Sequence, residues 1–464
     1  MNRTLRQTVV QNRQVPPVDT TATPQPLVRV VDAVAMIVGI VIGAGIFRTP
    51  SIVAGNASSV SVVYAAWILG GLVSLVGATV YAELATTYPH SGGDYYFLTR
   101  AFGSRLAFLF GWARMSVIQT GSITLFAFVV GDYATQIVSL GSYSPAIYAT
   151  LVVVVMTWLN ILGVRQGTGT QNLLTAIQVL GMLLVILAGF MAPAPELASN
   201  AAPPAATSSF GLMMVFVLFT YGGWNEAAYV SGELQDVRRN MARALILGVL
   251  VITALYVAIN WAYLHGLGLG GVAGSQQVAA DLVRRVFGDL GAKGVSLLIV
   301  IAALTSANAT VFTGGRSSYA FGQDFKQFGF MGRWSTKTGT PVNGLLIQAG
   351  VSLVLVLLGV FTRQGFQTMV DYTAPVFWFF FLLTGIAFFV LRRNDPTANR
   401  PFRVPLYPLP PLVFCVMCAY LLYSSLAYVR IGALAGVAVL GVGALMLLFV
   451  RPSTSDTKEN EGRS

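Results

Sequence analysis

Two apolar segments of this 464-residue chain are interrupted near their middle by small residues. One runs from Met36 to Phe47 around Gly43-Ala44-Gly45, and the other runs from Val217 to Glu226 around Gly222-Gly223. A helix that unwinds at such a point leaves free N–H groups at one new end and free C=O groups at the other. These ends carry partial positive and partial negative charge, so together they can bind a ligand that has both a carboxylate and an ammonium group.

The polarity of the two interruptions predicts which backbone atoms would bind each end of such a ligand. Glycine pairs in apolar helices more often mark close helix packing, as we expect for Gly70-Gly71 and Gly432. The interruptions instead occupy matching positions at the start of each half of the chain, which is typical of a transporter site. We predict that the carboxylate binds N–H groups of Ala44, Gly45 and Ile46, beside Gly43, and that the ammonium binds carbonyls of Val41, Ile42, Phe219, Thr220 and Gly222.

The composition indicates that lipid is the main solvent of this chain. Only 10% of its residues are charged, whereas a soluble globular domain carries about 25%. The apolar runs are continuous rather than alternating, which favours helices over a barrel. We predict an all-α membrane protein with about twelve transmembrane helices. Their approximate ranges are 31–55, 60–86, 104–136, 145–164, 170–192, 209–234, 239–266, 290–322, 341–361, 366–391, 405–428 and 431–450.

The basic residues predict the orientation. Most of the 28 Lys and Arg residues lie in loops on the same side as both termini, so the termini should be cytoplasmic in a multi-pass protein of the cell (inner) membrane. The same distribution explains the net charge of +11 without nucleic acid. We predict one transmembrane transporter domain over 27–451, between cytoplasmic tails at 1–26, which should be disordered, and 452–464. The domain divides into repeat one at about 31–192, repeat two at about 209–391 and extra helices at about 405–450.

Enzymatic and metal chemistry find no support in the sequence. It contains no metal-spaced His/Cys/Glu set, nucleophile elbow or phosphate loop, so we expect no enzyme activity, cofactor or metal. Cys415 and Cys418 form a CxxC pair inside an apolar run, and we interpret them as small buried residues.

One loop on the predicted outer side has helical periodicity. Between Ser275 and Gly288, the residues Val278, Leu282 and Val286 fall on one helical face, and Ser275 is placed to cap the helix. Such a helix is either a lid over the site or a segment that rests on lipid headgroups.

Five motifs follow one another along the chain. They are Gly43-Ala-Gly-Ile-Phe47; Tyr81-Ala-Glu-Leu84 with Ser91-Gly-Gly-Asp-Tyr95 and Ala101-Phe-Gly103; Phe219-Thr-Tyr-Gly-Gly-Trp-Asn225; Gly232-Glu-Leu234 with Arg239-Asn240 and Arg243-Ala244; and Arg400-Pro-Phe-Arg-Val-Pro-Leu-Tyr-Pro408. Together they resemble the amino acid–polyamine–organocation (APC) superfamily, and within it the L-type amino-acid transporters. The resemblance covers predicted helices 1 to 10 and the segment that leads into helix 11.

The resemblance implies a LeuT-type five-plus-five inverted repeat with discontinuous helices 1 and 6, plus two C-terminal helices. It also implies a permease that moves L-amino acids by alternating access, with Phe219 as a gate over the substrate, although a Phe in such a chain more often packs in the core or against lipid. Heteromeric animal relatives use a cysteine in the loop after helix 3. The loop near Gly141 has none, so we expect no disulfide-linked subunit and no partners besides the substrate and the bilayer.

Two departures from the family pattern concern the first helix and its surroundings. Ala44 stands where the family has Ser, so one hydroxyl donor is lost while backbone donors remain. Gln178 stands where many relatives carry a Lys, and it cannot titrate. Either Gln178 forms a plain helix–helix hydrogen bond, or the space holds water or Na⁺. The Na⁺ alternative would use oxygens of Thr305, Ser306 or Thr310.

The third departure is Glu226, where relatives often carry an aromatic residue. It is a proton carrier, a counter-ion for a basic substrate, or a structural residue in the first turn of a half-helix capped by Asn225. Arg114 lies deep in helix 3 and needs a carboxylate that the sequence does not identify. Glu83 falls near the inner face, where anchoring or ion pairing is expected.

We therefore predict secondary-active or exchange transport of neutral L-amino acids across the plasma membrane. One alternative is a cationic amino-acid or polyamine antiporter that uses Glu226 as counter-ion. A non-transporting membrane receptor is the alternative from another class, although these loops are short for one. The sequence leaves open which amino acid is carried, and whether by uniport, exchange or coupling to H⁺ or Na⁺.

Overall fold

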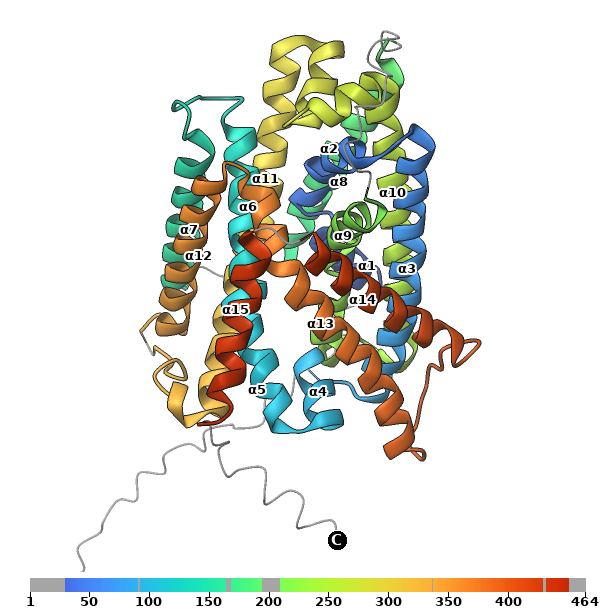
Figure 1. The fold of residues 1–464 in the computed structure, drawn as a ribbon, viewed down its shortest axis with the longest axis vertical. Helices are drawn as coiled ribbons and strands as arrows, with labels where there is room; N and C mark the ends of the chain where they lie inside the picture. Colours follow the sequence, from blue (N-terminus) through green and yellow to red (C-terminus); the bar gives the residue numbers. More distant parts are fainter. Residues whose placement is uncertain are drawn as a thin grey trace, which may run out of the picture.

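The computed structural model describes residues 30–90, 92–163, 168–193, 209–335, 337–428 and 431–449 as a bundle of helices (Figure 1). Within these ranges, Ser335 and Thr340 form an isolated β-bridge. The predicted tails at 1–26 and 452–464 lie outside the described residues.

The first half of the chain forms the following elements: α1 (Val30–Val41), η1 (Ala44–Phe47), α2 (Thr49–Asn56), α3 (Val60–Thr87), α4 (Asp94–Phe102), α5 (Ser104–Ala113), η2 (Arg114–Ile118), α6 (Gln119–Ala134), α7 (Ser144–Ile161) and α8 (Thr168–Met191). The second half forms α9 (Phe210–Tyr221), η4 (Trp224–Glu233), α10 (Val237–Gly274), α11 (Val278–Asp324), η5 (Lys326–Phe328), α12 (Val342–Thr362), α13 (Gly365–Asn394), α14 (Leu409–Ala427) and α15 (Ile431–Met446).

The membrane-crossing elements match the predicted fold class. Nine helices in the described part are long and apolar enough to cross a membrane, and Gly432–Met446 of α15 is a shorter apolar helix. Two further crossings are interrupted at the predicted breaks. The first consists of α1 and α2, and the sixth consists of α9 and η4. The all-α arrangement with discontinuous helices 1 and 6 is thereby confirmed.

Apolar side chains cover the outside of the bundle. On α7, Leu151, Val154 and Trp158 are 55%, 49% and 58% exposed. Water would penalise such a surface, whereas lipid tails do not. The exposed faces of the long helices are therefore suited to a bilayer.

Glycines allow helices to approach closely inside the bundle. A methyl group at Gly70 on α3 would lie 2.5 Å from Val217 of α9, and one at Gly71 would collide with Thr253 of α10. A methyl group at Gly432 would lie 2.6 Å from the carbonyl oxygen of Thr368. The packing role predicted for these three glycines is confirmed.

One helical segment was not expected, and a second extends the helix that was expected between Ser275 and Gly288. The predicted inner loop contains α4, which begins at Asp94 after Gly93, a residue with φ of 48°. The loop predicted between helices 7 and 8 is a helical hairpin. Its bends lie at Gly268 (φ 70°) and Gly288 (φ 67°), conformations that glycine adopts without a Cβ clash.

The hairpin packs on the protein and covers the end of the first crossing. Val278, Ala279 and Leu282 are fully buried, so the segment does not merely rest on headgroups. The predicted cap is wrong, because Gln277 occupies the cap position. Ser275 instead accepts a hydrogen bond from the Gln277 N–H and donates one to Asp281.

Arg48, which follows η1, holds the hairpin to the bundle. It donates to the Ser275 carbonyl at 3.4 Å and to the Gln276 side chain. Its Nε lies 3.7 Å from a carboxylate oxygen of Asp132 on α6. These contacts close the predicted outer end above the first break.

A buried carboxylate joins α3 to the end of α13 and to the chain that follows it, at the predicted inner end. Glu83 accepts two hydrogen bonds from Arg392, at 2.7 and 2.6 Å, and one from the Val404 N–H at 2.7 Å. The Nε of Arg400 lies 3.5 Å away, and the Glu83 side chain is only 3% exposed. The ion-pairing interpretation of Glu83 is confirmed.

Replacing Glu83 with Gln should lower the thermal unfolding midpoint of the purified protein in detergent, because two arginines lose their counter-charge. Removing one partner of a buried pair costs about 3–5 kcal/mol. Asp289→Asn is the matched control. That carboxylate also pairs with an arginine, Arg284, but is 84% exposed, so its loss should have little effect. Equal midpoints for the two variants would contradict the expectation.

Candidate functional site

The break in the first crossing is an extended turn followed by a short 3₁₀ helix. Helix α1 ends at Val41, and Gly43 is extended, with φ −79° and ψ −171°. A methyl group at Gly43 would lie 3.1 Å from the Phe126 ring of α6. The glycine therefore lets the unwound chain pass close to an aromatic side chain.

The break in the sixth crossing depends on a left-handed residue. Helix α9 ends at Tyr221, and Gly223 has φ 111° and ψ −22°, which L side chains rarely adopt. The 3₁₀ helix η4 begins at Trp224 and has Gly223 at its cap position. Asn225 is therefore not the cap, contrary to the prediction, although Glu226 does lie in the first turn.

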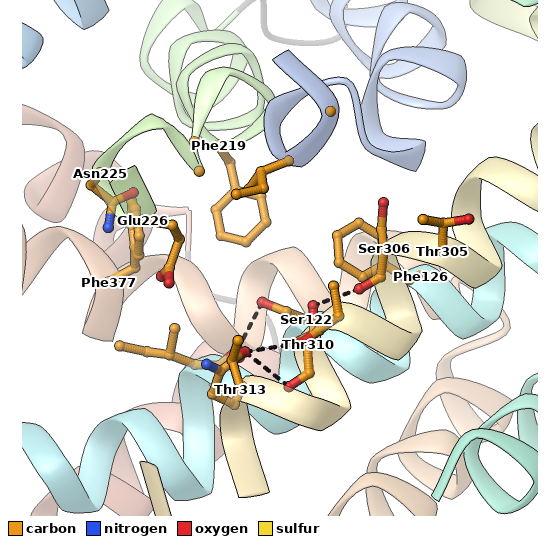
Figure 2. A pocket seen from close by; sticks show the side chains of 17 residues that line it. Ser122, Phe126, Phe219, Asn225, Glu226, Thr305, Ser306, Thr310, Thr313 and Phe377 are labelled. Carbon is orange, nitrogen blue, oxygen red and sulfur yellow. Dashed lines mark hydrogen bonds between the residues drawn. The ribbon is translucent and has the colours of Figure 1, made fainter. Parts of the chain in front are cut away.

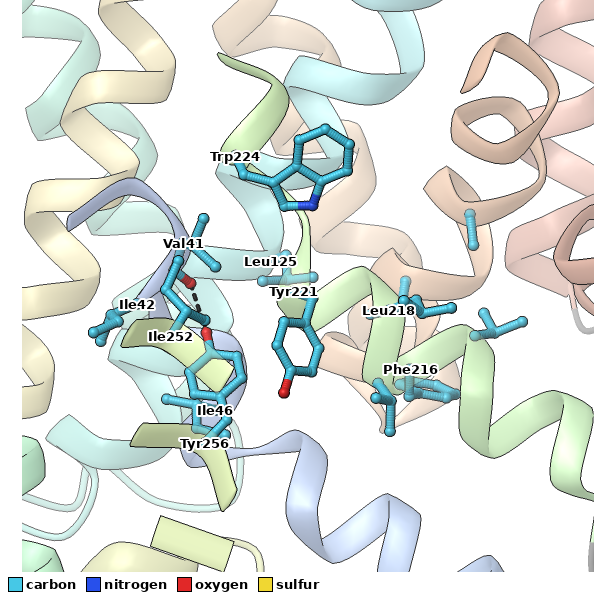
Figure 3. Close-up of a cluster of buried hydrophobic side chains, with 14 of the residues drawn as sticks. Val41, Ile42, Ile46, Leu125, Phe216, Leu218, Tyr221, Trp224, Ile252 and Tyr256 are labelled. Atoms are coloured by element: carbon cyan, nitrogen blue, oxygen red, sulfur yellow. Dashed lines mark hydrogen bonds between the residues drawn. The ribbon is translucent and has the colours of Figure 1, made fainter. Parts of the chain in front are cut away.

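Tyr256 of α10 connects the two breaks, and Figure 3 shows its hydroxyl beside Val41 of the first one. Its hydroxyl lies 2.7 Å from the carbonyl oxygen of Val41 and 3.2 Å from that of Thr220. The side chain is fully buried. Nothing in the local sequence singles out this tyrosine, since it lies in an ordinary apolar helix.

A pocket of about 190 Å³ lies against the end of α1 and the second break. Its walls come from the end of α1, from η2 and α6, from the break before η4, and from α11 and α13 (Figure 2). Six of the predicted site residues line it, namely Phe219, Gly222, Glu226, Thr305, Ser306 and Thr310. Phe219 has one edge against Phe377 of α13, with ring centroids 5.9 Å apart.

Other predicted residues lie behind the pocket wall. The Val41 carbonyl accepts from the Gly43 N–H at 2.6 Å as well as from Tyr256. Ile42 and Ile46 are fully buried, and a methyl group at Gly45 would lie 3.2 Å from Thr220. The Thr220 hydroxyl lies 2.8 Å from the Phe216 carbonyl oxygen and 2.7 Å from the Thr49 hydroxyl, so it can donate to the first and accept from the second. Ala44 lies in η1, and its side chain is outside the described part.

The proposed coupling residues divide into two groups. The hydroxyls of Thr305, Ser306 and Thr310 face the pocket wall while bonding to carbonyls of their own helix. Gln178 is buried away from the pocket, and its Nε2 donates to the Ala302 carbonyl of α11 at 3.2 Å. The helix–helix hydrogen bond that was the alternative for Gln178 is present.

Arg114 and Glu226 form an ion pair at the edge of the pocket. Arg114 begins η2, a five-residue π-helix inside the third crossing, and such bulges frequently occur at functional sites. Its Nη1 and Nη2 lie 3.3 and 3.1 Å from the two oxygens of Glu226, and its Nε lies 3.3 Å from the Ser317 hydroxyl. Arg114 thus has the carboxylate that the sequence did not identify.

A second buried acid lies next to this pair. Asp94 of α4 accepts hydrogen bonds from Tyr81 at 2.5 Å and from Thr384 at 3.3 Å. Burial raises the pKa of Asp94 to about 6, and Tyr81, Arg114 and Asn225 partly oppose this effect. Asp94 therefore connects α3, α4, α13 and the start of η4, and the sequence did not identify it as part of the site.

Comparison with known proteins gives one family. Residues 29–457 match the family described as "Amino acid permease". The mouse b(0,+)-type amino acid transporter 1 is 28% identical over 405 residues, 85% of this chain and 82% of the relative. The mouse large neutral amino acids transporter small subunit 2 is 30% identical over 408 residues, 85% of this chain and 75% of the relative. The mouse Asc-type amino acid transporter 1 is 28% identical over 430 residues, 90% of this chain and 78% of the relative.

These matches confirm the resemblance to the APC superfamily and its L-type amino-acid transporters. A permease moves its substrate across a membrane, so the expectation that the chain is not an enzyme is also confirmed. With its interrupted first and sixth crossings on either side of one pocket, this multi-pass membrane protein belongs to the amino acid permease family.

Proposed function

We propose that the chain transports neutral L-amino acids across the plasma membrane by alternating access. The observation that carries this proposal is the pocket bounded by the last turn of α1, just before the first break, and by the second break itself. Unwound segments present the backbone donors and acceptors that a carboxylate and an ammonium group require. The relatives' names, which specify amino acid transporters, support the same substrate class.

Charge around the pocket supports a neutral substrate side chain. Glu226, the acid that faces the pocket, is bonded to Arg114. A bound zwitterion then meets no net charge beyond the dipoles of the broken helices. A cationic amino-acid or polyamine antiporter with Glu226 as counter-ion would need that carboxylate to be available, so we propose the neutral class.

Sidedness and conformation are part of the proposal. Both termini would be cytoplasmic, and the hairpin between Gly268 and Gly288 would act as an outer lid, held closed by Arg48. On α11, Ser306, Thr310, Thr313 and Ser317 succeed one another at helical spacing, and Thr313 is exposed. This polar stripe supports a path from the pocket toward the cytoplasm.

Site roles and partners complete the proposal. The carboxylate would bind N–H groups of the first break, and Phe219 would gate the pocket. Thr305, Ser306 and Thr310 remain the candidates for ion coupling because they line the pocket. Both cysteines of the chain, Cys415 and Cys418, lie in the apolar helix α14, so we propose a permease without a disulfide-linked subunit.

Counterflow in proteoliposomes tests this function. The purified protein would be reconstituted in vesicles loaded with unlabelled leucine, and entry of labelled leucine measured with and without Na⁺ and at two pH values. We expect accumulation that unlabelled neutral amino acids abolish. Saturable binding of leucine without flux would instead identify a non-transporting receptor and overturn the proposal.

A further inference from the structure

The acid that faces the pocket is held by an arginine in a two-point contact (Figure 2 shows Glu226 beside Phe219). Among the described residues that line the pocket, Glu226 is the one carboxylate. Both of its oxygens accept from Arg114, at 3.3 and 3.1 Å. The Arg114 side chain is 8% exposed, against 30% for Glu226. The carboxylate therefore keeps a face toward the pocket while its charge is matched from behind.

This pairing decides what charge a bound side chain meets. A carboxylate without a partner in a poorly hydrated pocket attracts a cationic side chain strongly. With a bidentate guanidinium attached, the same carboxylate carries no net charge toward the ligand. A lysine-like ligand that displaced Arg114 would take from this largely buried guanidinium the carboxylate that it pairs with, which is unfavourable.

We propose that Arg114 excludes cationic amino acids from the site by occupying Glu226. This inference rests on the proposed transport function and deepens it. Arg114 would determine specificity as a positioning residue, acting through Glu226 and not through contact with the substrate. Asp94 strengthens the expected effect, since it interacts electrostatically with both members of the pair. Without Arg114, neither Glu226 nor the neighbouring Asp94 would have that guanidinium beside it.

The test is competition against labelled leucine in proteoliposomes that contain the full-length protein. In Arg114→Gln, leucine should still be carried, and lysine and ornithine should inhibit at concentrations at least about tenfold lower than in the wild type. Arg114→Lys keeps the cation and should keep the exclusion. Arg114→Gln combined with Glu226→Gln removes the carboxylate and should return lysine to weak inhibition. A purely structural role for Arg114 predicts none of this charge selectivity.

Two outcomes overturn the proposal: unchanged lysine inhibition in an Arg114→Gln protein that still carries leucine, or a gain that persists in the double variant. If Arg114→Gln aggregates, Arg114→His replaces it. Lysine should then inhibit at pH 8.5, where imidazole is neutral, and not at pH 6. The ammonium group of lysine stays charged at both values. Equal inhibition at both pH values contradicts the proposal.

The proposed function fails separately from this inference. Absence of flux for every neutral amino acid in the wild type overturns both. Wild-type flux of lysine comparable to that of leucine overturns the role of Arg114 and leaves amino acid transport intact.

Discussion

Replacing Tyr256 with Phe is expected to reduce leucine uptake about 5- to 150-fold, because the buried carbonyls at the two breaks lose a hydroxyl donor, a loss worth about 1–3 kcal/mol. The hydroxyl lies within hydrogen-bonding distance of carbonyls at both breaks, those of Val41 and Thr220. It is thus a direct link between the two discontinuous crossings. Its loss would release both unwound segments from α10 while leaving the aromatic packing unchanged.

The same helix offers a matched control for this variant. Tyr263 is also fully buried in α10, and its hydroxyl makes no hydrogen bond within the described part of the chain. Tyr263→Phe should therefore leave uptake unchanged, and both variants should remain monodisperse in detergent. Uptake that falls equally in the two would show that the loss does not arise from the link between the breaks.

The features that were predictable from sequence depend on local composition. Crossings could be located because lipid requires long apolar runs, and the breaks at Gly43 and Gly223 could be located because small residues interrupt those runs. The segment from Ser275 to Gly288, one arm of the hairpin, had its own helical periodicity. Each of these signals lies within some 30 consecutive residues, a range over which the sequence can be read directly.

The missing features depend on contacts between distant segments. Arg114 and Glu226 are 112 positions apart, and Tyr256 lies 215 positions from Val41. No periodicity indicates which arginine meets which carboxylate, because helix packing alone brings the two together. Asp94 was hidden for a further reason: it belongs to α4, a short amphipathic helix inside a segment that appeared to be a loop.

The sequence also does not indicate which of the two glycines of the second break is required by the backbone conformation. Gly222 has φ −59° and ψ 157°, a conformation open to any residue. Gly223 has φ 111°, where a β-branched residue is a true outlier. A methyl group there would also lie 3.1 Å from Ile40 of α1. The conformational requirement therefore belongs to Gly223 alone.

Gly223→Val should accordingly abolish leucine uptake, because η4 could no longer leave α9 at its present angle. Strained backbone of this kind costs about 1–3 kcal/mol, and the contact with Ile40 adds to it by pushing on the end of α1. Gly350→Val in α12 is the control, since a side chain there meets open space and φ is not positive. It should transport normally. Full uptake by Gly223→Val would show that the left-handed turn is dispensable, and that the break forms without it.

Normal folding of Gly223→Val with lost uptake, by contrast, would place the defect in the geometry of the site, where the two discontinuous crossings meet.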